Sequence, residues 1–231
     1  MKSKATTHPA APALPFPAPP ADPDDRARAR IVAHAGRVFA ERGFRKITID
    51  ELCAGLGMSK RTFYQRFENR DRLVEAVLLS TIGPIIPELI QNLDSDRPAR
   101  EIFDRHFDIL LNRLLPSLSM PFLADVQTLM PETWDRIEAF RSAIVAKLVQ
   151  LLRRGQAEGA FRDDVNPEVI GHIISALMAS VANPSFALAH GLSLPATARS
   201  LHAVIYRGML PLEEKRFTTE AQRHKGKKGK K

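Results

Sequence analysis

The fold is decided by residues 48–66, which read TIDELCAGLGMSKRTFYQR. Thr48 and Glu51 form a capping box, in which the Thr hydroxyl accepts from the Glu51 amide and the carboxylate accepts from the Thr48 amide. This box predicts a short helix that runs to about Ala54, and Ser59 caps a second short helix. Two short helices joined by a tight turn are typical of a helix-turn-helix.

The turn between these helices contains the small residues that a close helix crossing requires. Gly55 and Gly57 end the first helix. Cys53 is the small residue inside that helix, four positions before Gly57. The second helix is expected to expose side chains suited to base edges and phosphates, namely Lys60, Arg61, Thr62, Tyr64 and Gln65.

The charge distribution favours a polyanion-binding module at the same place. Residues 26–80 hold twelve basic and six acidic residues, a net charge of +6. Residues 81–211 hold twelve basic and fourteen acidic residues, a net charge of −2. The positive field is therefore concentrated around the predicted helix-turn-helix, as expected of a nucleic-acid-binding domain joined to a second unit.

Helical spacing and caps continue along the chain, and no convincing segment alternates with period two. The sequence therefore predicts an all-α fold. Pro84 and Pro87 end or kink the helix that Asn69 opens. Further helices are predicted over 102–114 with a stop at Pro116, over 121–130, from 131 to a closing Gly159, from 167 onward and over 195–209.

The longest segment without Asp, Glu, Lys or Arg runs from Val169 to Ala198. Its apolar front part, 169–182, is shorter than the ~20 residues of a membrane-spanning helix. We therefore predict a helix that is buried on several sides, and no membrane partner.

Composition excludes several classes of protein. Of the 231 residues, 44% are hydrophobic and one is a cysteine, Cys53, so a disordered chain or a disulfide-stapled miniprotein is not expected. There is no readable secretory signal and no glycine-rich phosphate loop.

No catalytic triad, carboxylate pair or complete metal set is present, since Glu168 and His172 make only half a metal site. We expect a cytoplasmic, nucleoid-associated protein that is not an enzyme and has no cofactor and no metal.

The chain resembles the N-terminal domain of the TetR family of transcriptional regulators. The match runs in order from Arg30 to Leu73, through FAERGF at 39–44, ITIDEL at 47–52, GMSKRTFYQRF at 57–67 and NRDRL at 69–73. Beyond it the similarity is one of architecture, apart from the segment GQAEGAFR at 155–162 followed by Pro167-Glu168. The family usually has Lys where this chain has Arg70, and smaller residues at Cys53 and near Arg61.

The resemblance implies roles for individual residues. Lys60 and Arg61 would lie near base edges, Thr62 and Tyr64 would contact the DNA backbone or thymine methyls, and Arg66 and Arg70 would face phosphates. The full set of expected DNA contacts is Thr48, Ser59, Lys60, Arg61, Thr62, Tyr64, Gln65, Arg66 and Arg70. Arg61 in place of a small residue would alter which bases are recognised.

A second set of residues has two interpretations. Aromatic and Met side chains in the later helices could line an effector pocket, or they could be plain core, because pockets and cores share this composition. These residues are Phe103, His106, Phe107, Phe122, Trp134, Phe140 and Met178. A buried imidazole at His106 would need a partner, either a ligand or another side chain. Cys53 is interpreted as an inert buried thiol rather than a redox sensor.

The sequence predicts a sequence-specific DNA-binding transcriptional regulator, a homodimeric repressor that recognises a palindromic operator and responds to a small apolar effector. The alternative is an architectural protein that binds double-stranded DNA without sequence preference. The predicted organisation is a disordered Ala/Pro-rich arm (1–25), the helix-turn-helix domain (26–72), a helical effector-binding and dimerisation domain (73–211) and a disordered basic tail (212–231).

Overall fold

The computed structural model describes residues 26–180 and 183–211, and every regular element in these ranges is a helix. The predicted all-α fold is confirmed. The predicted arm (1–25) and tail (212–231) lie outside the described residues. In chain order the helices are α1 (Arg26–Arg42), α2 (Ile49–Leu56), α3 (Lys60–Tyr64), α4 (Arg70–Ile82), α5 (Ile86–Leu93), α6 (Ala99–Ile109), the π-helix η1 (Leu110–Leu114), α7 (Leu115–Ser117), α8 (Met120–Leu129), α9 (Pro131–Ala157), α10 (Pro167–Ala179), α11 (Pro184–Ala189) and α12 (Leu194–Met209).

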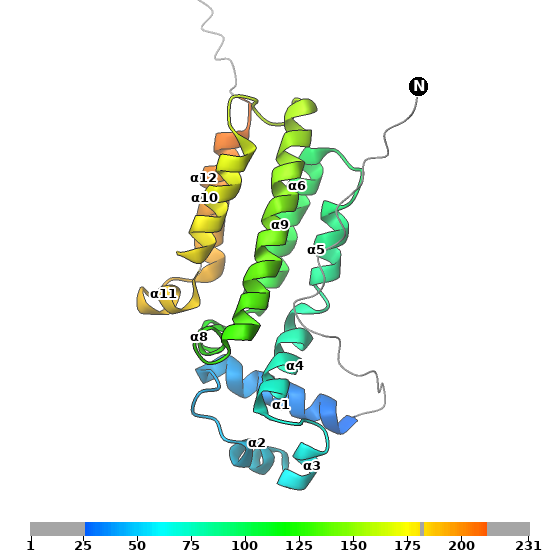
Figure 1. Cartoon of the computed structure of the whole chain (residues 1–231), viewed down its shortest axis with the longest axis vertical. Coiled ribbons are helices and arrows are strands. Elements are labelled where there is room, and N and C mark those ends of the chain that lie inside the picture. Colours follow the sequence, from blue (N-terminus) through cyan, green and yellow to red (C-terminus); the bar gives the residue numbers. More distant parts are fainter. Residues whose placement is uncertain (1–25, 181–182, 212–231) are drawn as a thin grey trace, which may run out of the picture.

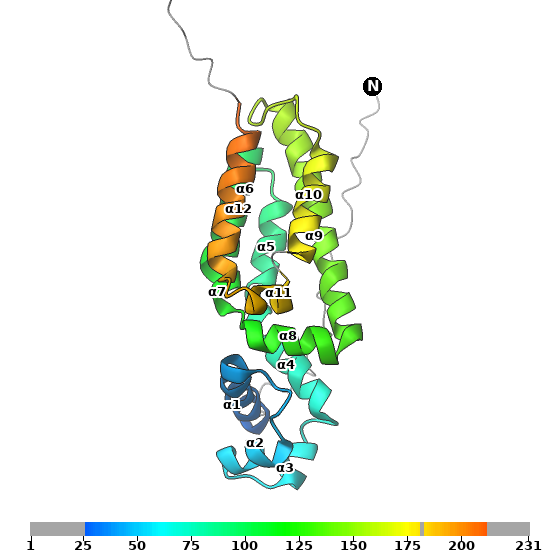
Figure 2. The same ribbon diagram turned by 90° about the vertical axis from the view of Figure 1, so that its left-hand side faces the viewer.

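The molecule is elongated, with α1, α2 and α3 gathered at one end (Figure 1). The helices α5, α6, α9, α10 and α12 run along its length, and α8 lies across their lower ends next to α1. Turned by 90°, the view has α10 and α12 in front, on the same side of the molecule (Figure 2). The helix-turn-helix therefore projects at one end of a helical body.

The largest apolar core joins α1–α4 to α8. Phe39, Phe63 and Leu73 are fully buried in it, and Phe122 from α8 belongs to the same cluster. The ring of Phe39 lies 5.7 Å from the rings of both Phe44 and Phe122, measured between centroids. Because α8 supplies part of this core, the small N-terminal helices bury more apolar surface than they could alone.

Two further clusters fill the helical body. Phe103 on α6 packs with residues of α9, α12 and the α9–α10 loop, including Phe161. Ile109, at the other end of α6, packs with α5 through Ile86 and Leu89. His106 lies on α6 between Phe103 and Ile109 and is itself buried, with 3% of its surface exposed. The imidazole thus interrupts an apolar face, as its spacing predicts.

Two expectations about the helices were wrong, and one helix was not predicted. Pro116 does not stop its helix at once. The helix continues through the π-helix η1 into α7 and ends at Ser117, because a proline is tolerated in the first turn of the short helix α7. The helix α11 was not predicted. The helix α10 is not buried on several sides in the single chain, where only Gly171 is buried, fitted against Val149 of α9.

Among the described residues, no single helix combines the length and the apolar character needed to cross a membrane. Two bent pairs, α4 with α5 and α6–α7 with α8, meet the criterion by length and composition alone.

Gly57 provides a test of the turn between α2 and α3. It has a left-handed backbone with φ +62°, and a Cβ there would meet nothing within 4 Å. Gly57→Ala is therefore expected to lower the free energy of unfolding by about 1 kcal/mol through backbone strain alone. Gly57→Asn should cost less, because Asn tolerates this conformation. Urea denaturation measures both, and an equal loss for Ala and Asn would contradict this account.

Candidate nucleic-acid interface

The start of α2 is fixed by the predicted capping box. The Thr48 Oγ1 accepts from the Glu51 amide at 3.2 Å, and the Glu51 carboxylate accepts from the Thr48 amide at 2.7 Å. The hydrogen bonds that the Glu51 carboxylate accepts from the backbone and the side chain of Thr48 lower its pKa, so the cap is charged at neutral pH. The Thr48 hydroxyl also donates to Glu51 at 3.0 Å. Thr48 therefore holds the helix start while remaining exposed.

The end of α2 lies two residues beyond the predicted one, because Gly55 stays helical. A Cβ at Gly55 would lie 2.7 Å from the His34 ring, so this glycine lets α1 approach α2 closely. Gly57 then terminates the helix, and the Met58 amide donates to the Cys53 carbonyl at 3.0 Å. Cys53 is buried, and burial raises the pKa of its thiol, in agreement with an unreactive core cysteine.

The helix α3 buries one side and exposes the other. Ser59 caps it by accepting from the Thr62 amide at 3.1 Å. Phe63 is fully buried, whereas Tyr64 is 54% exposed and its ring is held edge-on against Phe63, with centroids 5.3 Å apart. Seven of the expected contacts lie together on this helix, at its N-cap or in the turn after it, and all are exposed except the half-buried Thr62. They are Ser59, Lys60, Arg61, Thr62, Tyr64, Gln65 and Arg66.

The cations near α3 differ in how they are held. The Lys60 Nζ lies 2.8 Å from the Asp50 carboxylate, and both side chains are exposed, so this pair contributes little to stability. Arg70, the first residue of α4, is half-buried, with its guanidinium 5.1 Å from the centre of the Phe44 ring. Its Nε and Nη2 atoms are buried without a hydrogen-bond partner among the described residues. The Arg70 guanidinium is therefore partly covered, unlike the exposed cations of α3.

The residues proposed for an effector pocket do not come together in one place. Phe103 and Phe107 belong to the cluster with α9 and α12, and their rings lie 4.8 Å apart. The others are divided among the core shared with α1 (Phe122, Trp134), the cluster with α5 (Phe140) and a half-buried position on α10 (Met178).

His106 is the polar member of that set. Burial lowers its pKa to about 4, so the imidazole is neutral at pH 7. Its Nδ1 has no hydrogen-bond partner among the described residues. Glu168, considered above as half of a metal site, is paired with Arg153. Within the described ranges, no three His, Cys, Asp or Glu side chains are grouped as metal ligands.

Comparison with known proteins agrees with this geometry. Residues 31–77 match the family model described as bacterial regulatory proteins of the tetR family, and residues 128–192 match that of the tetracyclin repressor-like C-terminal domain.

The chain belongs to the TetR family of helix-turn-helix regulators.

Relatives and solved structures of transcriptional regulators extend the match over most of the chain. The uncharacterized HTH-type transcriptional regulator YvaF of Bacillus subtilis is 26% identical over 80% of this chain and 96% of its own length. A transcriptional regulator from Saccharomonospora viridis in complex with choline shares the fold with a TM-score of 0.63 at 22% identity, over 81% of this chain and 100% of that one. The ketosteroid regulator KstR2 of Mycobacterium tuberculosis has a TM-score of 0.59 at 17% identity, over 81% and 96%.

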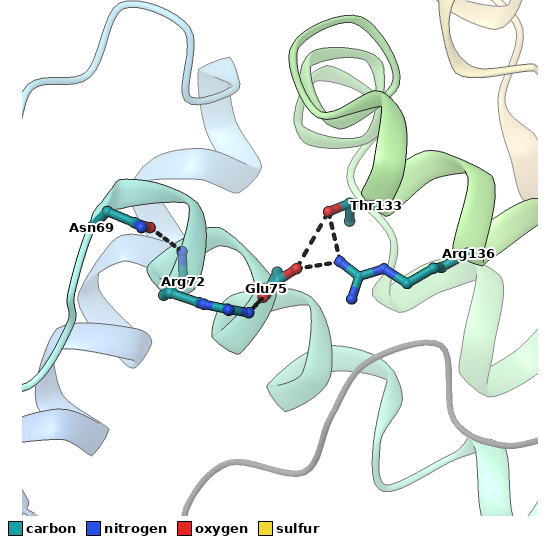
Figure 3. Close-up of polar contacts among 5 residues, drawn as sticks. All are labelled: Asn69, Arg72, Glu75, Thr133 and Arg136. Carbon is teal, nitrogen blue, oxygen red and sulfur yellow. Dashed lines mark hydrogen bonds and ion pairs between the residues drawn. The ribbon is translucent and has the colours of Figure 1, made fainter.

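In this TetR-family chain, two carboxylates tie the helix-turn-helix to the helical body. Asp125 on α8 accepts from the amides of Phe44 and Arg45 at 2.7 and 2.8 Å, just after α1. Glu75 on α4 is bonded to Arg136 and Thr133 at the start of α9 (Figure 3). Sequence reasoning missed both residues, because their partners lie 58 to 81 positions away and leave no local pattern.

Proposed function

We propose that this transcriptional regulator is a homodimeric repressor that binds a palindromic operator and is released by a small apolar effector. The observation that carries the proposal is α3, which exposes Lys60, Arg61 and Tyr64 around the buried Phe63 at one end of the molecule. Cations and an aromatic ring on one short exposed helix suit phosphates and the major-groove edges of bases. The proposed contacts are those named from the sequence, including a phosphate contact by Arg70.

Dimerisation is proposed from two exposed helices on the same side of the body. On α10, Val169 and Ile173 are 52% and 43% exposed, and Val204 on α12 is 73% exposed. Large apolar side chains that remain exposed on one side are typical of an interface. Two copies joined there form a four-helix bundle. The dimer would present two α3 helices about 34 Å apart, as a palindromic site requires.

An effector site is proposed within the helical domain, over residues 73–211. The S. viridis neighbour is a choline complex, which supports a small-molecule site in this fold. His106 is the polar group proposed to orient the effector, since its Nδ1 is buried and without a partner. The protein is proposed to act in the cytoplasm on the nucleoid, without enzymatic activity, using residues 26–72 to bind DNA.

Selection of bound sites from a random duplex library, at near-physiological salt, tests the proposal. Enrichment of a two-fold symmetric motif is expected. Binding without enrichment, and with a steep dependence on salt, would instead favour the architectural alternative of DNA binding without sequence preference.

Tyr64→Ala tests the assignment of α3. Loss of an aromatic contact of about 1 kcal/mol in each of two half-sites should weaken operator binding by about 30-fold. Sedimentation should show an intact dimer. Leu129→Ala, which removes another exposed apolar side chain at the end of α8, serves as the matched control and should bind like the wild type. Unchanged operator affinity of Tyr64→Ala would overturn the assignment.

A further inference from the structure

The carboxylate of Glu75 is the centre of a polar cluster between α4 and α9. Its Oε2 accepts from the Arg72 Nη1 at 2.9 Å. Its Oε1 accepts from the Arg136 Nη2 and from the Thr133 Oγ1, the latter at 3.4 Å, and Arg136 also donates to Thr133 at 3.0 Å. Only 12% of the Glu75 side chain is exposed. Oε2 therefore bonds within α4, and Oε1 faces α9 (Figure 3).

The two sides of this cluster belong to different parts of the protein. The Arg72 amide donates to the Asn69 Oδ1 at 2.9 Å, so Asn69 caps α4 a few residues after α3. Thr133 and Arg136 lie in the first two turns of α9, the 27-residue helix against which α10 packs. Glu75 thus joins the segment that follows the proposed recognition helix to the helix that supports the proposed dimer face.

The Glu75 cluster holds a charged carboxylate between two guanidinium groups. Hydrogen bonds from the two guanidinium groups lower the pKa of Glu75 despite its burial, so it is charged at neutral pH. The bond to Arg72 stays within α4 and orients the carboxylate, whereas the charge-assisted bond to Arg136 joins α4 to α9. The Glu75 carboxylate lies near the N-terminus of α9, where the dipole of that helix favours a negative charge. If Glu75 is lost, Thr133, which is 3% exposed, no longer has this charged partner.

A second anchor lies on the other side of the junction, where Asp125 holds the turn after α1. Glu75 adds a polar link between α4 and α9 to this anchor and to the apolar core that α1–α4 share with α8.

We propose that Glu75 is a positioning residue for operator recognition, which sets the angle between α4 and α9 and thereby the separation of the two α3 helices in the dimer. This inference rests on the proposed function. The inference adds to the proposed function the residue that determines which half-site spacing the dimer accepts.

The test uses the full chain, the operator obtained by selection, and variants of that operator in which the half-sites are moved one or two base pairs closer or further apart. Wild-type protein should prefer one spacing. Glu75→Gln is expected to lose about tenfold in affinity at that spacing and to discriminate less among the others. Its affinity for a non-specific duplex should not change, whereas a general loss of folded protein would weaken every duplex alike.

A matched control is available within the helical body. Glu88 on α5 also accepts from two arginines, Arg105 and Arg113, which lie on α6 and η1 rather than on α4 or α9. Glu88→Gln should keep the spacing preference of the wild type. Arg136→Gln should reproduce the effect of Glu75→Gln, and combining the two should add little, because both remove the same contact. An unchanged spacing profile in Glu75→Gln would overturn the inference.

A measurement without DNA separates this inference from the proposed function. Spin labels at Gln65→Cys on the turn after α3 and Ala146→Cys on α9 report the angle of the junction, and both positions are exposed. The distribution of distances between the labels should be broader in Glu75→Gln than in the wild type or in Glu88→Gln. If the wild type selects no symmetric site, the proposed function fails. An unbroadened distribution contradicts the role of Glu75 whatever the DNA result.

Discussion

Lowering the pH from 7 to 4 is expected to remove about 3 kcal/mol from the free energy of unfolding through His106 alone. Burial lowers its pKa to about 4 in the folded chain, against the ordinary 6.5. As the pH falls, the unfolded chain therefore takes up a proton before the folded chain does. The contribution is constant above pH 6.5, declines between 6.5 and 4, and levels off below.

His106→Leu isolates this effect. The variant should lose about 3 kcal/mol less than the wild type between pH 7 and 4, because it has no imidazole to protonate. At pH 7 it should be at least as stable as the wild type, since it removes a buried Nδ1 without a partner.

Urea denaturation at several pH values gives both curves. His202, whose pKa is also lowered by burial, is present in both proteins and cancels in the difference. A difference between wild type and variant that stays constant over this range would show that His106 is hydrated in the folded state.

Replacing Asp125 with Ala is the second change with a large expected effect, a loss of about 3 kcal/mol in the free energy of unfolding. Its Oδ2 accepts from two successive amides, those of Phe44 and Arg45, and the side chain is 13% exposed. The preceding Gly43 has φ +73°, and a Cβ there would lie 2.3 Å from the same oxygen. The turn and the carboxylate are therefore fitted to each other, and without Asp125 the amides lose a charged acceptor.

Two controls separate the backbone contacts from the ion pair. Asp125→Asn keeps one carbonyl oxygen and should lose about half as much. Arg45→Met removes only the pair between Nε and Oδ1 at 3.3 Å, whose cation is 54% exposed, and should cost at most about 1 kcal/mol. Chemical denaturation of the three variants measures the order. A loss in Arg45→Met equal to that in Asp125→Ala would assign the stabilisation to the ion pair.

The sequence predicts those parts of the fold whose signals lie within a few residues of one another. The capping box at Thr48 and the caps at Ser59 and Asn69 are all present where the sequence places them. The helix α11 carried such a signal too, because Asn183-Pro184 repeats the cap and first-turn proline of Asn166-Pro167.

The π-helix at Leu110–Leu114 could not be predicted, because an inserted residue in a run of leucines leaves no Gly or Pro signal. The aromatic residues proposed for a pocket share helical spacing with ordinary core residues, and three-dimensional packing divides them among separate clusters. Glu75 and Asp125 look like ordinary surface acids on their helices. Only tertiary packing brings them to partners far away in the chain.

The contribution of α8 to the core of the helix-turn-helix bears on the construction of hybrid regulators. A cut after Ile82 would separate α1–α4 from Phe122 and Asp125, leaving the rings of Phe39 and Phe44 uncovered and the turn after α1 without its acceptor. A foreign effector domain grafted at that point would have to supply a helix with an aromatic residue and, three positions later, a carboxylate. Exchanges that begin after Ile137 would keep this core and the side chains packed against it whole.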